Sequence, residues 1–152
     1  MPRFADRSVH RGGSRIQNIL KVLEKKLKGP KPGLKAQLKM ITKPRPGNKT
    51  YQEAEDSSLK AGVLILIYPR MKRLHLVLTK RTADVLFHQG QISFPGGRQD
   101  KGESLQQTAL REAQEELKIE PHKIRILGEL TPLYIPPSNY CIYPIVATTY
   151  SR

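Results

Sequence analysis

The sequence predicts an α/β domain in which strands surround one acidic helix. Runs rich in Val, Ile and Leu at residues 61–68 and 73–79 have the composition of strands. Residues 104–117 instead place apolar side chains at helical spacing, and two more strand-like runs follow at residues 124–130 and 140–149. Strand and helix patterns that alternate in this way are typical of α/β proteins. With 152 residues, the chain suits one domain that is large enough to bury a core.

The first 27 residues divide into a tail and a helix. Residues 1–15 lack an apolar period and contain two adjacent glycines, so we expect a mobile tail, with an Arg-rich targeting peptide as the alternative. In residues 16–27 the apolar side chains recur at helical spacing: Ile16, Ile19, Leu20, Leu23 and Leu27. This pattern predicts an amphipathic helix that docks on the domain. A membrane-surface helix is the alternative, although the apolar face lacks the Trp and Phe typical of that class.

The segment after this helix is basic and rich in proline. Residues 29–48 contain four prolines, which prevent a continuous helix, so we expect an extended connection that completes a basic region over residues 16–59. Residues 1–59 carry 14 Lys and Arg against 5 Asp and Glu, which is +9 of the chain's formal charge of +14. A basic surface of this kind attracts nucleic acid, acidic lipid or phosphorylated small molecules.

The next elements lead to a glycine-rich loop. Residues 61–68 and 73–79 are separated by a Pro-Arg-Met-Lys turn, which predicts a β-hairpin. A short strand is expected at residues 91–94, and Phe94, Pro95, Gly96 and Gly97 then form a tight loop. Because glycine lacks a Cβ, the backbone of this loop can approach a phosphate or an ion.

The predicted helix at residues 104–117 has an acidic edge beside its apolar stripe, and Ser104 is a suitable N-cap. With Leu105 at zero and roughly 100° per residue, Glu112, Glu116 and Glu115 lie near −20°, +20° and −80°. Like charges spaced three and four residues apart repel each other. The edge is therefore either a solvated face or a site for a cation, and Mg²⁺ is the hard ion that carboxylates prefer.

The order of residues around this helix resembles the Nudix box, the signature of hydrolases that act on nucleoside diphosphates linked to another group. The matching positions are Gly97, Glu103, Arg111, Glu112, Ala113, Glu115, Glu116 and Ile119. Lys118 departs from the pattern because the family usually has glycine there, where a left-handed cap would cost lysine on the order of 1 kcal/mol. The resemblance implies a Nudix-like α/β/α sandwich with a mixed β-sheet over residues 60–152.

The same resemblance implies the residues of the site. Glu112, Glu115 and Glu116, together with the backbone carbonyl of Gly96, would hold Mg²⁺ or Mn²⁺. Glu112 is the first candidate for activating water, and Glu115 is the second. Arg111 belongs to the catalytic set, but its place near −120° on the wheel favours orienting a glutamate, or tying the loop at Glu103, over contact with substrate.

A second motif precedes the box. LTKRTADVLFHQGQISFPGG, residues 78–97, resembles the extra motif of the coenzyme A diphosphatase branch of the family. Arg81, His88 and Gly97 are the candidates for substrate binding. Leu86 departs from the pattern because that branch carries an arginine there, a cation suited to phosphate; Thr82 also differs. The resemblance implies that coenzyme A or acyl-CoA is split into a phosphopantetheine product and adenosine 3′,5′-bisphosphate.

Two other functions stay open. Leu86 keeps an ADP-sugar or dinucleotide hydrolase as an enzymatic alternative. A different class is a catalytically silent Nudix-like module whose basic N-terminal region binds RNA. The expected partner is a small-molecule nucleoside diphosphate, and nucleic acid is the alternative. The complete set of glutamates favours the enzyme, because a binding module has no chemical need for them.

The sequence also gives expectations for the cellular compartment and for the C-terminal part of the domain. One cysteine, Cys141, excludes an internal disulfide and is typical of a reducing compartment, so we expect a cytoplasmic protein. The longest apolar run, residues 61–68, is far shorter than the roughly 18 residues that a membrane span needs. Family members normally continue through another strand and helix after the equivalent of Thr149. We therefore expect the C-terminal part of the domain to be missing, and a partner subunit in a homodimer or a swapped segment to cover the core there.

Overall fold

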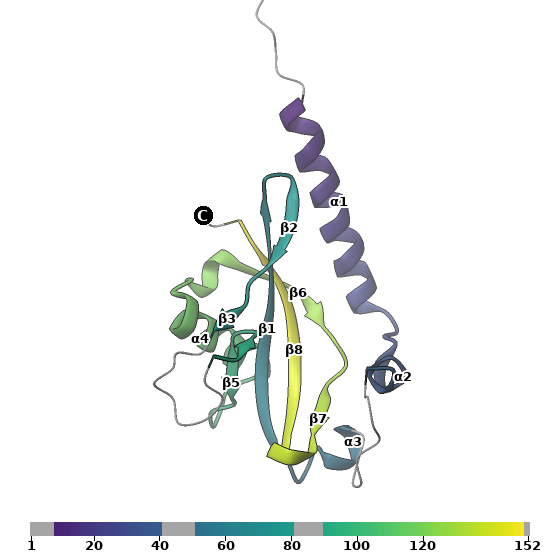
Figure 1. Cartoon of the computed structure of the whole chain (residues 1–152), viewed down its shortest axis with the longest axis vertical. Helices are drawn as coiled ribbons and strands as arrows, with labels where there is room; N and C mark the ends of the chain where they lie inside the picture. The colour runs from purple at the N-terminus through teal and green to yellow at the C-terminus, as the bar shows by residue number, and fades with distance from the viewer. Residues whose placement is uncertain (1–7, 41–50, 81–89, 151–152) are drawn as a thin grey trace, which may run out of the picture.

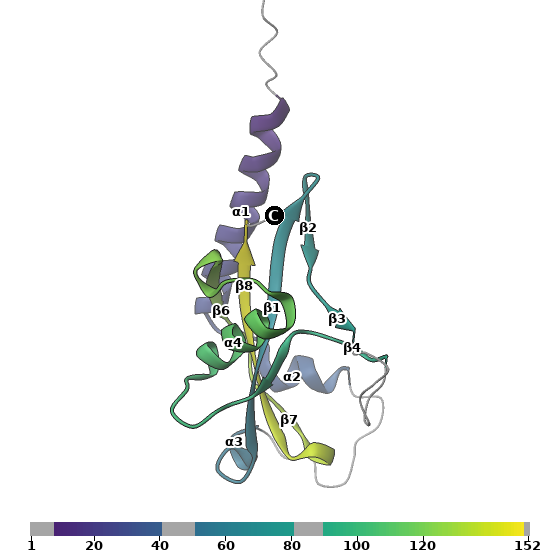
Figure 2. The same ribbon diagram turned by 90° about the vertical axis from the view of Figure 1, so that its left-hand side faces the viewer.

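A mixed β-sheet lies between two helical layers (Figures 1 and 2). The structure is a computed structural model that describes residues 8–40, 51–80 and 90–150. The sheet has six strands with the main order β2-β1-β8-β6, while β5 pairs with β1 and β7 pairs with β8. Helix α4 covers one face, and α1 covers the other. The predicted α/β class with a mixed sheet is confirmed.

The central pair of the sheet is parallel, and the outer strands run antiparallel to it. Residues Leu59 to Ile67 of β1 pair in parallel with residues Tyr140 to Thr148 of β8. The strands of the sheet are β1 (Leu59–Arg70), β2 (Arg73–Leu76), β5 (Gly96–Arg98), β6 (Ile124–Glu129), β7 (Leu133–Ile135) and β8 (Tyr140–Thr149). Two short strands, β3 (Thr79–Lys80) and β4 (Ile92–Ser93), form a separate antiparallel ribbon.

The predicted hairpin is confirmed, with a tighter turn than the sequence suggests. Strands β1 and β2 pair up to Arg70 and Arg73, so only Met71 and Lys72 lie between the strands. Both residues have positive φ angles, 49° and 62°. Two left-handed residues give a turn whose twist matches that of the flanking strands. The strand therefore continues through Pro69 and Arg70, which the sequence assigns to the turn.

Helix α1 spans Ser8–Lys28 and begins earlier than its apolar spacing predicts. Its first turns include residues 8–15, which we expected in the tail, and they contain Gly12 and Gly13. Each glycine costs a helix only about 1 kcal/mol relative to alanine. A helix that is stabilised by packing further along can include them.

The connection after α1 is not wholly extended. Six residues form α2 (Gly33–Leu38), and α3 (Tyr51–Ala54) precedes β1. Pro32 occupies the N-cap of α2, a position where the missing N–H of proline removes no hydrogen bond. The prolines therefore limit where this helix begins and do not prevent it. Two 3₁₀ turns, η1 (Pro121–Lys123) and η2 (Pro136–Ser138), complete the secondary structure with α4 (Leu105–Leu117).

One core lies between the sheet and α4. The sheet contributes alternate residues of β1 and β8, and the helix contributes two alanines whose small size allows it to lie close to the strands. The buried members are Leu64, Leu66, Ile145 and Ala147 from these strands, Ile124 from β6, and Ala109 and Ala113 from α4. This contact fixes the height of α4 above the sheet, and with it the position of the acidic edge.

A second core lies under α1. Ile16, Leu20 and Leu27 of α1 are buried against residues from three strands, namely Ile67, Leu127 and Val146. Outside this core, the Glu24 carboxylate accepts a hydrogen bond of 2.8 Å from Arg125 of β6. Arg125, and then Lys28, hold the pKa of Glu24 below its usual value. The predicted docking helix is confirmed, because its apolar stripe packs on the sheet.

This second core changes one expectation. We expected a partner subunit or a swapped segment to cover part of the core. On the sheet face opposite α4, helix α1 of the same chain covers the core. Dimerisation stays a prediction. None of the described helices is long and apolar enough to cross a bilayer.

Candidate active site

Helix α4 begins and ends where the sequence predicts. The Ser104 hydroxyl accepts a 3.2 Å hydrogen bond from the Gln107 backbone N–H, and the Gln107 side chain accepts one of 2.7 Å from the Ser104 N–H. This capping box satisfies two backbone donors at the start of the helix. At the other end Lys118 is the C-cap, in the left-handed conformation with φ 59° and ψ 26°.

A glycine allows α4 to approach β1. A Cβ on Gly62 would lie 3.0 Å from the backbone nitrogen of Ala109 and 3.2 Å from the Thr108 Cβ. Only a residue without a side chain fits under the helix at this distance. The acidic edge of α4 is therefore held close to β5, which pairs with β1 at the same level.

The predicted glycine loop is in part a strand, since Gly96–Arg98 forms β5 and pairs with β1. Direct backbone hydrogen bonds join Gln99 N to Lys60 O at 2.9 Å and Leu64 N to Pro95 O at 2.8 Å. Bonded and non-bonded pairs alternate in an antiparallel ladder, so the Gly96 carbonyl, opposite Val63, points away from β1. This oxygen is placed to accept a partner outside the sheet.

The second glycine of the loop makes room for a catalytic candidate. A Cβ on Gly97 would overlap the carboxylate of Glu112. The sequence predicts that the missing Cβ allows a close approach, and the group that approaches is a glutamate of the protein itself. Gly97 thus fixes where the Glu112 carboxylate lies, at the junction of β5 and α4.

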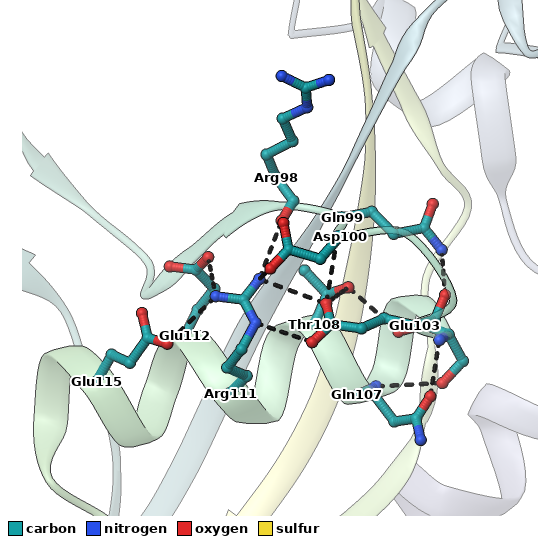
Figure 3. A network of polar contacts seen from close by, with 10 residues as sticks. Arg98, Gln99, Asp100, Glu103, Gln107, Thr108, Arg111, Glu112 and Glu115 are labelled. Atoms are coloured by element: carbon teal, nitrogen blue, oxygen red, sulfur yellow. Dashed lines mark hydrogen bonds and ion pairs between the residues drawn. The ribbon is translucent and has the colours of Figure 1, made fainter.

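Arg111 lies at the centre of the acidic cluster (Figure 3). Its guanidinium donates to Glu103 at 2.9 Å, to Glu112 at 2.7 Å and, more weakly, to Glu115 at 3.4 Å. A fourth contact of 3.1 Å reaches the backbone carbonyl of Arg98 in β5. The hydrogen bonds that Arg111 donates to Glu103, and then to Glu112, raise the pKa of the guanidinium above its ordinary value. These contacts support the predicted roles of Arg111, orienting a glutamate and tying the loop at Glu103, which stay predictions.

Glu103 anchors the loop between β5 and α4. Besides Arg111, its carboxylate accepts hydrogen bonds from the Thr108 hydroxyl at 2.9 Å and the Asp100 N–H at 3.3 Å. Arg111, and then Thr108, lower the pKa of Glu103. We did not predict Thr108, which is fully buried. The sequence feature that could have indicated Thr108 is a hydroxyl side chain next to the apolar stripe, five residues after Glu103.

This lowered pKa predicts a pH-dependent stability. A carboxyl whose folded pKa lies below its unfolded value stabilises the fold above the unfolded pKa, about 4.3, and loses that contribution as the pH falls through the folded pKa. We expect Glu103→Gln to lower the free energy of unfolding at pH 6 and to have a smaller effect at the acidic end of the range. Urea denaturation of both proteins at several pH values measures the difference. The contribution of Glu24 is common to both and cancels, so a difference that stays constant with pH would contradict the prediction.

The carboxylates differ in exposure. The side chain of Glu112 is 17% exposed, that of Glu115 is 59% exposed, and Glu116 is also exposed. Within the described ranges, no group of three or more His, Cys, Asp and Glu side chains is gathered as a metal site. In this arrangement the cation between the carboxylates of Glu103, Glu112 and Glu115 is Arg111.

The donor set nevertheless fits a hard divalent cation. Carboxylate and carbonyl oxygens are the ligands that Mg²⁺ and Mn²⁺ prefer. Arg111 contacts only the Oε1 atom of Glu112 and of Glu115, and each carboxylate has a second oxygen. Two predicted substrate contacts, Arg81 and His88, lie outside the residues that the structure describes.

The cap at Lys118 gives a prediction for stability. A left-handed lysine costs on the order of 1 kcal/mol relative to glycine, so we expect Lys118→Gly to raise the free energy of unfolding by about that amount. Lys118→Ala is the matched control, because alanine keeps the Cβ and both changes remove the hydrogen bond from Lys118 Nζ to the Glu115 carbonyl. Urea denaturation compares the three proteins. Equal stability of the glycine and alanine variants would disprove a conformational cost at this cap.

Sequence comparison supports the assignment of the motif. Residues 58–143 match the model of the NUDIX domain, more than half of the chain. The chain is 44% identical over 92 residues to the uncharacterized Nudix hydrolase NudL of Photorhabdus laumondii, which covers 60% of this chain and 48% of that protein. It is 35% identical over 91 residues to Nudix hydrolase 3 of Caenorhabditis elegans, covering 60% and 38% respectively. The chain spans about half or less of the length of these relatives.

Solved structures agree on the fold. The crystal structure of the C. elegans Ap4A hydrolase superposes with a TM-score of 0.53 at 19% identity, covering 62% of this chain and 70% of that one. RenU, a Nudix hydrolase from M. Smegmatis, superposes with a TM-score of 0.52 at 18% identity, covering 62% and 63%. At this level of identity the likeness concerns the fold alone. With the matched domain, the box residues on α4 and the mixed sheet between helices, the chain belongs to the Nudix family.

Proposed function

We propose that the protein hydrolyses the diphosphate bond of a nucleoside diphosphate derivative, with coenzyme A or acyl-CoA as its substrate. One observation carries the hydrolase proposal: Arg111 and the space over Gly97 together hold the Glu112 carboxylate beside β5, next to an outward-facing Gly96 carbonyl. An acid held in place at the end of a glycine-rich strand is suited to chemistry on a bound polyanion, because it needs no rearrangement when the substrate arrives.

A divalent metal completes the proposed site. Glu112, Glu115, Glu116 and the Gly96 carbonyl would hold Mg²⁺ or Mn²⁺. When bound, the metal neutralises charge on the diphosphate oxygens and polarises phosphorus. Glu112 is the first candidate to accept a proton from the attacking water, with Glu115 second. Arg111 keeps Glu112 oriented and stays out of contact with the substrate.

The choice of coenzyme A depends on the motif before the box. That motif ends at Gly97 and so leads directly into the strand that carries the site. The proposed contacts to the substrate are Gly97, Arg81 and His88. Leu86 replaces the arginine of the coenzyme A branch, and this replacement favours an ADP-sugar or dinucleotide hydrolase as the second candidate.

A substrate panel tests both candidates. The protein is incubated with Mg²⁺ and coenzyme A, ADP-ribose or diadenosine polyphosphates, and the products are separated by chromatography. We expect adenosine 3′,5′-bisphosphate from coenzyme A, and we expect Glu116→Gln to abolish its formation. Faster turnover of ADP-ribose or a dinucleotide would replace coenzyme A by the second candidate. No turnover of any compound would leave the silent RNA-binding module as the better interpretation.

A further inference from the structure

The layer formed by α1 and α2 carries a large excess of positive charge. Residues 15–39 contain eight Lys and Arg and a single acid, Glu24. All eight cationic side chains are exposed: Arg15, Lys21, Lys25, Lys26, Lys28, Lys31, Lys35 and Lys39. Figure 1 shows both helices on the side of the sheet opposite α4. The basic layer is therefore separate from the acidic edge that holds the proposed active site.

The single carboxylate of this layer does not neutralise it. Glu24 accepts from Lys28 at 3.3 Å and from Arg125 of β6 at 2.8 Å, so one negative charge is shared between two cations. Side chains of the same sign at this density repel one another and reduce the stability of the fold. A partner with many negative charges would remove that cost.

Exposed aliphatic side chains are mixed with the lysines. Val22 is 59% exposed and Ile19 is 44% exposed on α1, and the α2 segment exposes Leu34, Leu38 and Met40 by 40%, 51% and 84%. On the helical wheel Val22 and Ile19 lie on the same flank of α1 as Arg15, Lys25 and Lys26. This flank is distinct from the stripe that packs on the sheet, because Ile16, Leu20 and Leu27 are buried.

These two features together favour a lipid surface over a nucleic acid. Single-stranded nucleic acids are held by aromatic side chains that stack on bases, and residues 15–40 contain no aromatic residue. The Trp and Phe typical of membrane-surface helices are missing for the same reason, so the preference for lipid depends on the lysines and the exposed aliphatic side chains, and a polybasic segment binds anionic headgroups without aromatic residues. Lysines that surround exposed aliphatic side chains are instead typical of segments that bind anionic bilayers, where the cations contact headgroups and the aliphatic groups enter the interface.

We infer that the α1–α2 layer, residues 15–40, binds the surface of an anionic lipid bilayer. The membrane alternative from the sequence placed the stripe of Ile16, Leu20 and Leu27 in the lipid, whereas the structure buries that stripe under the sheet. The surface that binds lipid is the outer flank, with Val22, Lys25 and Lys26. The acidic edge of α4 faces away from the bilayer, so the active site stays open to water-soluble substrate.

Vesicle sedimentation tests this inference. The full chain is mixed with vesicles of phosphatidylcholine alone or with phosphatidylglycerol added, at about 0.1 M salt, where the screening length is roughly 10 Å. We expect binding to be at least about tenfold tighter to the anionic vesicles and to weaken as salt is added. Equal binding to both vesicle types, or no binding to either, would overturn the inference.

Matched variants locate the surface. Lys25→Glu is expected to weaken binding to anionic vesicles by about tenfold. Lys123→Glu, the same charge change at the exposed end of η1, should have little effect. Val22→Ser should weaken binding without changing its salt dependence. Thermal melts that match the unmodified protein show that each variant is folded, and equal losses for Lys25→Glu and Lys123→Glu would contradict the assigned surface.

A parallel measurement of RNA binding tests whether the layer binds nucleic acid and not lipid. Binding of a labelled single-stranded RNA is followed by fluorescence polarisation under the same salt conditions. RNA binding that is lost in Lys25→Glu, with no vesicle binding, would replace the inference by an RNA-binding layer. Because the variants lie outside the proposed active site, turnover of a soluble substrate should be unchanged in all of them, whichever substrate the enzyme prefers.

Discussion

Replacing Glu112 by glutamine is expected to lower kcat by about 10²–10³-fold, the range seen when one preorganised polar group is removed from an active site. The amide has the same shape as the carboxylate, so it still fits over Gly97. It has no negative charge to hold a cation and is a poor acceptor of a proton from water. Steady-state hydrolysis of coenzyme A, or of whichever compound the panel identifies, measures the effect.

Two comparisons make this result specific. Glu120→Gln is the matched control, because Glu120 lies just beyond α4 and its side chain is 54% exposed. Its kcat should equal that of the unmodified protein. Arg111 loses one of its charged partners in Glu112→Gln, so a small loss of stability is expected, and activity is compared well below the melting temperature. A Glu112→Gln protein that is folded and fully active would exclude Glu112 from the chemistry.

The second large effect is on stability, at the contact between α4 and β1. Gly62→Ala is expected to lower the free energy of unfolding by about 1–3 kcal/mol. The new methyl group would meet backbone atoms of α4, such as Ala109 N at 3.0 Å, and a backbone cannot turn aside as a flexible side chain can. Urea denaturation measures the change.

Gly29→Ala provides the control for this substitution. A Cβ at Gly29 would meet only the Lys26 carbonyl at 3.7 Å, an ordinary contact, so its effect should stay within about 0.5 kcal/mol. Because Gly62→Ala pushes α4 away from the sheet, it should also reduce activity at temperatures where the protein stays folded. If both alanine variants are equally stable, the close approach of α4 to β1 is not a determinant of the fold.

The sequence predicts the elements whose signals are local. The hairpin of β1 and β2, the strands β6 and β8, and α4 with its Ser104 cap all follow from apolar period and capping chemistry within a few residues. The orientation of Arg111 toward Glu103 follows from helical geometry, because Arg111 lies near −120° on the helical wheel and the loop at Glu103 adjoins the start of the helix.

The missed features depend on contacts between distant residues. Strand β5 exists because Gly96 and Gly97 pair with Val63 and Gly62, more than 30 positions earlier in the chain. Glycine has a low intrinsic preference for strands, so no local pattern indicates it. The role of Gly97 shows the same limit: its missing Cβ was predicted to admit a ligand, while the structure fills the space with Glu112.

The parallel pairing of β1 with β8 has a consequence for synthesis on the ribosome. Strands β2 and β5 pair with parts of β1 and follow it sooner, but Leu59 to Ile67 find their parallel partners in Tyr140 to Thr148, some 80 positions later. At 5–20 residues per second, β1 waits roughly 4–16 s for β8 to be translated. During that interval the edge of β1 that later meets β8 is open to other nascent chains, and it includes the wholly aliphatic stretch Val63 to Ile67. We therefore expect yield in cells to depend on chaperones that bind this strand, and slower translation to increase aggregation.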